Sequence, residues 1–156
     1  MDDFFNTIRE QEAPKNWRAQ QCSPIALAFL GDTVFDLYLR TKLVSTSRVS
    51  ANAMHLKASS YAKAASQARM MRAIEERLTP EEQGIYRRGR NAKSLSVPKN
   101  AKLSDYKVAT GFEAVLGYLF LEGKDQRLTE IIEAALASMD RKEQMHGEHE
   151  PDHCRP

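Results

Sequence analysis

Residues 28–37 read AFLGDTVFDL, and the overlapping run 25–30 is apolar on every side. A helix of this composition has to bury that end all round, either against its own domain or against a partner. Ser23 and Pro24 stand directly before it and supply an N-cap and a proline at the first helical position. The sequence therefore predicts a helix over residues 24–43.

Further helices are expected along the rest of the chain, with no convincing strand. Ser47 is the expected N-cap of the second helix, and Thr79 begins a capping box followed by proline, Thr-Pro-Glu-Glu. Gly123 separates the last two helical patterns. The additional predicted helices cover residues 48–58, 61–78, 80–88, 105–122 and 125–141. The predicted fold class is all-α.

The chain has 156 residues, of which 42% are hydrophobic and 28% charged, so one domain with a real core is expected. No apolar run is long enough to cross a bilayer, which argues against a membrane protein. No secretory signal is evident, and the two cysteines, Cys22 and Cys154, suggest no disulfide framework, so we expect a cytoplasmic protein. We divide the chain into an N-terminal segment (1–22), a domain (23–141) and a polar tail expected to be disordered (142–156).

Two carboxylates stand in strongly apolar surroundings. Asp32 follows the run 25–30, and Glu113 lies within GFEAVLGYLFL, residues 111–121. Neither has a basic residue one helical turn away, and an isolated buried carboxylate is costly. The small residues near the two acids would let their helices approach closely with the carboxylates facing each other; these are Ala28, Ala109 and Gly117. Two carboxylates plus waters suit Mg²⁺, which prefers oxygen ligands.

An alternative interpretation needs no metal. Asp32, Asp36 and Arg40 recur every four residues, as on the solvated face of an amphipathic helix, and Asp36 with Arg40 would form an ordinary surface ion pair. Glu113 would then only mark the place where its helix meets water. Helix periodicity alone does not decide between the two interpretations.

Positive charge is concentrated in residues 86–107. This segment has one acid, Asp105, and a net charge of +6, whereas the whole chain has only +2. Clustered charge on an otherwise acidic protein is typical of a surface that binds a polyanion, although a solvated basic loop is the simpler alternative. A loop is expected over residues 89–104. The basic residues are Arg87, Arg88, Arg90, Lys93, Lys99, Lys102 and Lys107.

Three motifs in order resemble one enzyme family. AFLGDTVFDL (28–37) is similar to the signature helix of the ribonuclease III family, and GFEAVLG (111–117) to its second acidic motif. RRGRNAKS (87–94), followed by VPKN (97–100), narrows the resemblance to the Mini-III ribonucleases, which lack an appended domain for binding double-stranded RNA. The resemblance covers about residues 23–136.

By this resemblance the domain is a helical, homodimeric endonuclease, and Asp32 and Glu113 are the acids at a catalytic Mg²⁺. Asp36 is either a further ligand or a residue beside the ligands. Three other acids of full-length ribonuclease III are replaced here, as they are in Mini-III enzymes, so water or substrate oxygens would have to complete the metal shell. Those positions hold Ile25, Ala28 and Thr110.

The resemblance also implies how RNA and a second subunit are bound. Phe29 matches a position that inserts into a socket on the partner, with burial in the core of its own subunit as the alternative. Without an appended domain, phosphate contacts have to come from the basic segment. Such contacts read the shape of A-form RNA and not its sequence. The implied RNA-binding residues are Arg87, Arg88, Arg90, Asn91, Lys93 and Lys99.

The function expected from the sequence is Mg²⁺-dependent cleavage of double-stranded RNA to 5′-phosphate and 3′-hydroxyl ends. By resemblance the substrate is precursor large-subunit (23S) ribosomal RNA, with a large-subunit ribosomal protein as a candidate partner. Three of the four histidines lie in the polar tail, leaving His55, so a paired-histidine mechanism is not expected. The alternatives are a catalytically idle RNA-binding or ribosome-associated scaffold, and a helical protein-interaction module.

Overall fold

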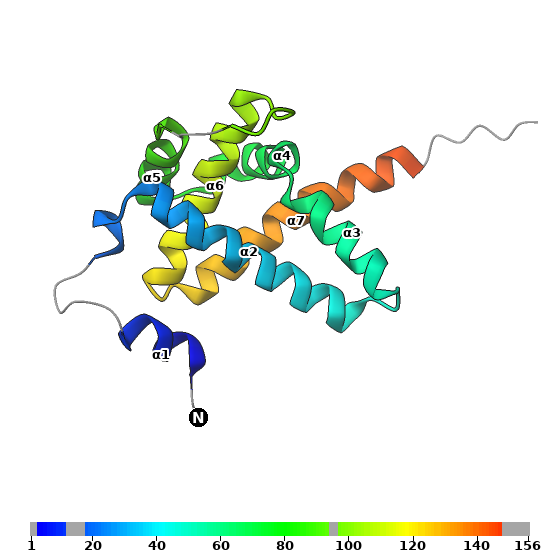
Figure 1. Cartoon of the computed structure of the whole chain (residues 1–156), viewed down its shortest axis with the longest axis horizontal. Helices are drawn as coiled ribbons and strands as arrows, with labels where there is room; N and C mark the ends of the chain where they lie inside the picture. The colour runs from blue at the N-terminus through cyan, green and yellow to red at the C-terminus, as the bar shows by residue number, and fades with distance from the viewer. Residues whose placement is uncertain (1–2, 12–17, 94–96, 148–156) are drawn as a thin grey trace, which may run out of the picture.

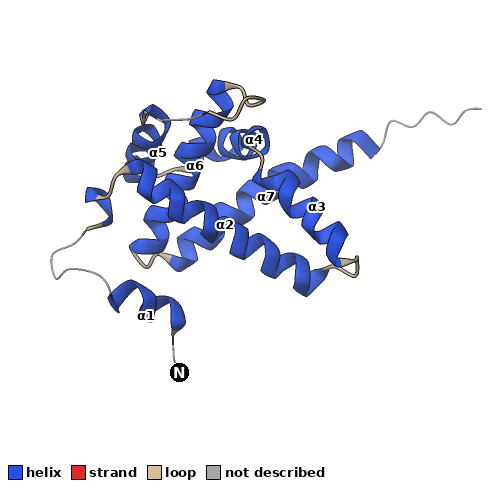
Figure 2. Cartoon of the chain, in the orientation of Figure 1, coloured by secondary structure: helices blue, strands red, loops and turns tan. Residues whose placement is uncertain are grey.

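The computed structural model describes residues 3–11, 18–93 and 97–147 and contains no strand within them, which confirms the all-α class (Figures 1 and 2). Two short 3-10 helices, η1 (Ala19–Gln21) and η2 (Glu75–Arg77), accompany the α-helices. No helix in these ranges combines the length and apolarity needed to cross a bilayer. The α-helices are α1 (Phe4–Gln11), α2 (Pro24–Thr46), α3 (Ala51–Ala62), α4 (Ala64–Ile74), α5 (Pro80–Asn91), α6 (Leu103–Leu121) and α7 (Asp125–Gly147).

The helix boundaries set by local capping chemistry agree with the sequence. The Ser23 hydroxyl accepts a hydrogen bond from the Ala26 N–H at the start of α2. At the start of α5, Thr79 and Glu82 form the expected capping box. Gly123 follows α6 with φ of +69°, a left-handed conformation that glycine adopts without strain. These caps account for where the main helices begin and end.

Helices α3 and α4 differ from the prediction. Ser47 is the residue after α2 and donates its N–H to the Leu43 carbonyl, so it ends that helix instead of starting the next. Ser50 is the N-cap of α3. The predicted helix over residues 61–78 is also wrong, because the chain is extended at Lys63 and α4 begins after it. Serine favours helix N-caps, and Ser47 and Ser50 are both candidates, so the sequence did not distinguish them.

Four helices run past their predicted ends; α2 reaches Thr46 and α3 reaches Ala62. α5 continues to Asn91, so the predicted loop 89–104 shrinks to the segment between α5 and α6. α7 continues to Gly147, past its predicted end at residue 141, and residues 148–156 of the predicted tail lie outside the described part of the chain. A polar composition is compatible with an exposed helix end as well as with a coil, which is why the boundary was misplaced.

The N-terminal segment contains α1, which the sequence analysis did not predict. Arg9 fastens α1 to the domain: its Nη1 donates to the Phe120 carbonyl and to Asp125, both at 3.0 Å. The guanidinium also lies 4.9 Å from the centroid of the Phe120 ring. This short helix is therefore held by contacts with residues more than 100 positions away, which a local pattern does not reveal.

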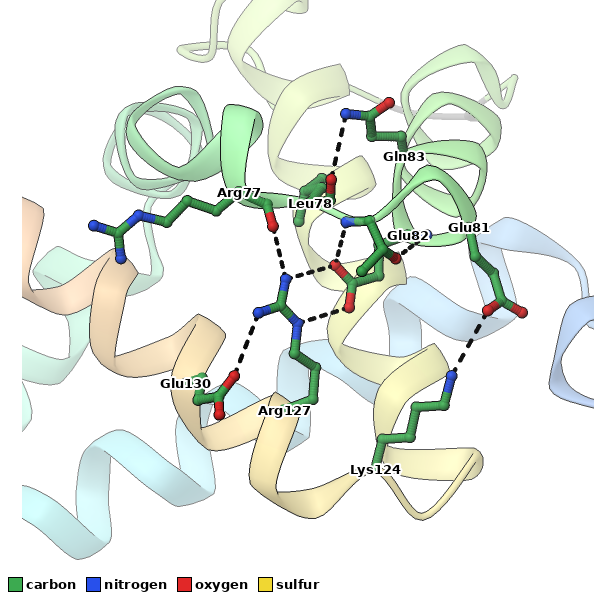
Figure 3. Close-up of polar contacts among 9 residues, drawn as sticks. Arg77, Leu78, Glu81, Glu82, Gln83, Lys124, Arg127 and Glu130 are labelled. Carbon is green, nitrogen blue, oxygen red and sulfur yellow. Dashed lines mark hydrogen bonds and ion pairs between the residues drawn. The ribbon is translucent and has the colours of Figure 1, made fainter.

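A partly buried ion pair joins the start of α5 to α7 (Figure 3). Glu82 is buried, accepts from the Thr79 N–H at 2.9 Å, and forms an ion pair with Arg127 at 2.8 Å. Arg127 also donates to the Arg77 carbonyl at 2.7 Å. Burial opposes the charge of Glu82, but the bonds from Arg127 and Thr79 outweigh it and keep the pKa of Glu82 below its ordinary value.

The central contact of the fold is the crossing of α2 over α6, the most extensive packing between any two elements (Figure 1). Two glycines make it possible. A Cβ atom on Gly31 would lie 1.7 Å from the carbonyl oxygen of Glu113, and one on Gly117 would lie 2.0 Å from the carbonyl oxygen of Leu27. The two backbones are thus in direct contact, and next to them Phe35 and Phe112 pack edge to face at 5.8 Å.

Substitution of Gly31 by alanine tests this crossing. The added methyl group meets backbone that has no room to move, so we expect a loss of about 3 kcal/mol or more in the free energy of unfolding. Gly84→Ala is the control, because nothing lies within 4 Å of its added Cβ and alanine favours a helix. Thermal unfolding should show a large fall in Tm for Gly31→Ala and no fall for Gly84→Ala; equal Tm values would contradict the close crossing.

Candidate active site

Asp32 and Glu113 line one cleft of about 370 Å³. Asp32 comes from α2 and Glu113 from α6, and α4 contributes Gln67 to the same wall. The cleft lies at the crossing, because Asp32 follows Gly31 and the backbone oxygen of Glu113 is the atom that Gly31 approaches. The structure therefore brings together the two acids that the sequence singled out.

The charges of these two acids are uncompensated within the described part of the chain. No hydrogen bond or ion pair involving described residues reaches either carboxylate, in line with the lack of a basic residue one turn away. Burial, with a further contribution from the negative charge of Asp32, raises the pKa of Glu113 to about 8. Burial and the charge of Asp36 raise the pKa of Asp32. The pair resists full ionisation unless a cation lies between the two groups.

This donor set suits a hard divalent cation. The two carboxylates supply oxygen atoms only, which fits Mg²⁺ better than a thiolate- or imidazole-seeking metal. Within residues 3–11, 18–93 and 97–147, no group of three or more His, Cys, Asp or Glu side chains is placed to hold a metal. A cation bound here would therefore keep much of its water shell, as Mg²⁺ does in many proteins.

Asp36 lies one turn further along α2 and is occupied by a different partner. Both of its carboxylate oxygens accept from the Nε of Arg40, at 2.9 and 2.8 Å. Asp36 is also absent from the residues that form the cleft wall. Its geometry is that of the i,i+4 surface ion pair that the periodicity suggested, and its negative charge acts on Asp32 from outside the cleft.

The positions of the three missing family acids lie around the same cleft. Ile25, Ala28 and Thr110 all belong to its wall. Thr110 turns its hydroxyl onto the Tyr106 carbonyl at 2.9 Å. The cleft lies between α2 and α6, and the acids among its described lining residues are Asp32 and Glu113.

The basic residues differ in their freedom to bind a ligand. Arg88 donates from Nη1 to the Gln20 carbonyl (2.9 Å) and from Nη2 to the Cys22 carbonyl (3.1 Å), so it holds the chain before α2 against α5. Arg90 lies 5.4 Å from the centroid of the Tyr86 ring. The remaining predicted RNA-binding residues are exposed: Arg87, Asn91, Lys93 and Lys99.

Phe29 is the most exposed large apolar residue of the described chain, at 82%. The alternative that it belongs to the core of its own subunit is therefore wrong. Ile25 (42%) and Leu37 (50%) are exposed on the same helix, whereas Leu27 and Ala28 are buried. All-round burial of the run 25–30 is not achieved within one chain, and α2 presents exposed apolar side chains to the outside.

Sequence reasoning missed Gln67 and Tyr106, which line the cleft. Gln67 lies more than 30 positions from either acid, and no spacing pattern connects α4 to the two acidic motifs. Only the tertiary packing of α4 against α6 identifies Gln67 as part of the site. Tyr106 stands two turns before Glu113 on α6 itself, so helical spacing alone could have placed it on the same face.

The raised pKa of Glu113 predicts how the metal-free protein responds to pH. The Glu113 carboxyl titrates near 8 in the folded protein and near 4.5 in the unfolded chain. It therefore lowers the free energy of unfolding as pH rises between those values. In EDTA, Glu113→Gln should therefore match the wild type near pH 5 and exceed its free energy of unfolding by about 1 to 3 kcal/mol near pH 8. Denaturant unfolding at both pH values measures the difference in free energy of unfolding between the variant and the wild type. A difference that shrinks as pH rises would contradict the raised pKa of Glu113.

Known proteins resemble this chain in sequence and in structure. The ribonuclease III domain family matches residues 25–124. Mini-ribonuclease 3 of Thermoanaerobacter sp. (strain X514) is 46% identical over 114 residues, covering 73% of this chain and 80% of the relative. That of Clostridium tetani is 38% identical over 130 residues (83% and 86%), and that of Enterococcus faecalis 44% over 115 residues (72% and 87%).

The fold is also found in a solved structure, protein FN1578 from Fusobacterium nucleatum. It superposes with a TM-score of 0.69 at 25% identity and covers 77% of this chain and 96% of that chain. The matched segment 25–124 contains both cleft acids, the α2–α6 crossing and the basic end of α5. On these grounds the chain belongs to the ribonuclease III family, in its Mini-ribonuclease 3 branch, and is an endoribonuclease.

Proposed function

We propose that this endoribonuclease cleaves double-stranded RNA in a Mg²⁺-dependent reaction that leaves 5′-phosphate and 3′-hydroxyl ends. The observation that carries the proposal is the pair of carboxylates, Asp32 and Glu113, sharing one cleft without a compensating cation. Family membership supplies the reaction class. The cleft supplies the place where the reaction can occur.

Asp32 and Glu113 would hold the ion. When bound, Mg²⁺ supplies a water of lowered pKa and positive charge for the leaving 3′-oxygen. The chain's own contribution is to fix the two carboxylates on packed helices and to keep the bottom of the cleft apolar, with Ala28 and Ala109 in its wall. Among the described residues, no histidine or lysine lines the cleft, and His55 is exposed on α3.

Neutralising either acid tests the reaction. Asp32→Asn and Glu113→Gln should each lower the rate of cleavage of a long RNA duplex in Mg²⁺ by at least about 100-fold, since even residues beside metal ligands commonly contribute 10- to 100-fold. Duplex binding in EDTA should remain largely intact in a gel-shift assay.

Asp36→Asn is the matched control, because Asp36 is paired with Arg40 outside the cleft wall. It should cut within a few-fold of the wild type; a loss as large as that of Asp32→Asn would place Asp36 among the ligands. Wild-type protein that binds duplex RNA but leaves it intact in Mg²⁺ would instead support an idle scaffold.

For the RNA-binding surface we favour the exposed basic residues at the end of α5 and in the segment after it. Each phosphate contact releases counterions, so binding should weaken with salt. Arg87→Ala, Lys93→Ala and Lys99→Ala should each reduce the salt slope of the logarithm of the binding constant by roughly 1 for each contact that is lost.

Arg88→Ala is the comparison within the same basic run. Its guanidinium is bonded to the Gln20 and Cys22 carbonyls, so its removal should lower Tm in addition to any effect on binding. Binding titrations from low to moderate salt give the slopes. A slope near zero for the wild type would exclude this surface.

We also propose a homodimer formed through the exposed apolar side chains of α2. Phe29, Ile25 and Leu37 are exposed on this helix, and exposed large apolar side chains are typical of a contact between subunits. Sedimentation of the protein should give twice the mass of the chain, and a monomer mass at micromolar concentration would refute the proposal.

The cellular substrate we propose is the double-stranded stalk of precursor large-subunit (23S) ribosomal RNA in the cytoplasm, with a large-subunit ribosomal protein as a candidate partner. This proposal rests on the resemblance of the sequence motifs to those of the Mini-III ribonucleases, the branch to which the chain belongs. Incubation of the precursor with the enzyme in Mg²⁺, with and without the ribosomal proteins, checks the proposed substrate and the proposed partner. Cleavage elsewhere than in that stalk would exclude this substrate.

A further inference from the structure

Gln67 is a buried polar residue in the wall of the acidic cleft. Its side chain comes from α4, is 1% exposed, and lines the cleft together with Asp32 and Glu113. Both polar atoms of its amide, Nε2 and Oε1, are buried and have no hydrogen-bond partner. It is the one residue with such atoms in the described part of the chain.

The other buried polar side chains of the described residues are satisfied. Ser66, the neighbour of Gln67 on α4, donates its hydroxyl to the Ser60 carbonyl at 2.8 Å. Glu82 is bonded to Thr79 and Arg127. An unpaired buried amide is costly, and each such group in a natural structure calls for an explanation.

Packing alone does not explain an amide at this position. Met70 and Met71 on the same helix are fully buried and fill space without polar atoms. A methionine at position 67 would occupy nearly the same volume as glutamine and would avoid the cost of the amide. The amide therefore points to a role in the cleft that an apolar side chain of the same length cannot perform.

We propose that Gln67 is a positioning residue for the cation held by Asp32 and Glu113, an inference that rests on the proposed function. With the ion bound, its Nε2 group would donate to the carboxylate of Glu113, and its Oε1 would accept from a water of the ion's shell. The side chain has several rotatable torsions, so the amide can turn into the cleft without movement of α4. Groups that orient metal ligands in this way commonly contribute 10- to 100-fold to metal affinity.

The role of Gln67 can be tested without RNA cleavage. Mn²⁺, a paramagnetic substitute for Mg²⁺, is titrated into the RNA-free protein and its binding is followed by electron paramagnetic resonance. Gln67→Met should bind Mn²⁺ about tenfold more weakly or worse than the wild type. In EDTA its Tm should equal or exceed that of the wild type, because an unpaired polar group has been removed.

Ser66→Ala is the matched control. It removes a buried polar group from the neighbouring position that lies outside the cleft wall, so it should lower Tm and leave Mn²⁺ affinity unchanged. If Gln67→Met does not fold, Gln67→Leu serves in its place. The combination of retained stability and weakened metal binding separates a positioning role from a structural one.

Other outcomes overturn the inference in distinguishable ways. Equal Mn²⁺ affinity in Gln67→Met and the wild type would refute the role of Gln67 while leaving the acidic pair in place. A marked fall in Tm in EDTA for both Gln67 variants would show that the amide has a structural partner. If the wild type binds no Mn²⁺, the proposed metal site itself fails, and the inference fails with it.

Discussion

The direct contact between the backbones of α2 and α6 at Gly31 and Gly117 is the constraint on which the site depends. Gly31 has no room for a Cβ because the carbonyl oxygen of Glu113 occupies that space. The residue after Gly31 is Asp32, so the packing contact and the chemical pair come from the same turn of each helix. A looser crossing would separate the carboxylates as well as the helices, and the same glycines therefore serve both folding and the cleft.

Stability and chemistry oppose each other in this cleft. Burial raises the pKa of Glu113 to about 8, and Asp32 adds repulsion. Gln67 adds a buried amide without a partner. The surrounding core is well packed: the ring of Phe35 packs edge to face on Phe112, the residue before Glu113. Unfavourable groups gathered in one place, within a well-packed frame, are characteristic of functional sites.

The features that the sequence predicted well have local causes. Ser23, the Thr79 capping box and Gly123 each act within a few residues, and their helix ends were correct. The two acids were recognisable because a charge inside an apolar run is conspicuous, and their shared cleft follows from small residues on both helices.

The errors arose where distant contacts or equivalent local choices decide the structure. The break at Lys63 lies in an alanine-rich stretch that favours one continuous helix, and the chain there is stabilised by the bond from Ser66 to Ser60. α1 depends on Arg9 meeting Asp125 across the sequence. Gln67 carries no local sign of its place in the cleft. These features depend on packing partners that a linear pattern does not identify.

The bonds of Arg88 to two backbone carbonyls bear on how a polyanion would meet this surface. A count of cations treats the basic run as uniform, but the fold fixes the direction of the Arg88 guanidinium, whereas Arg87 and Lys93 are exposed. Arg88 still adds to the attractive potential, although its donors cannot turn to follow a passing phosphate group. Different side chains therefore provide long-range electrostatic attraction and direct phosphate contacts, so the site of first encounter with a nucleic acid can differ from the final binding site.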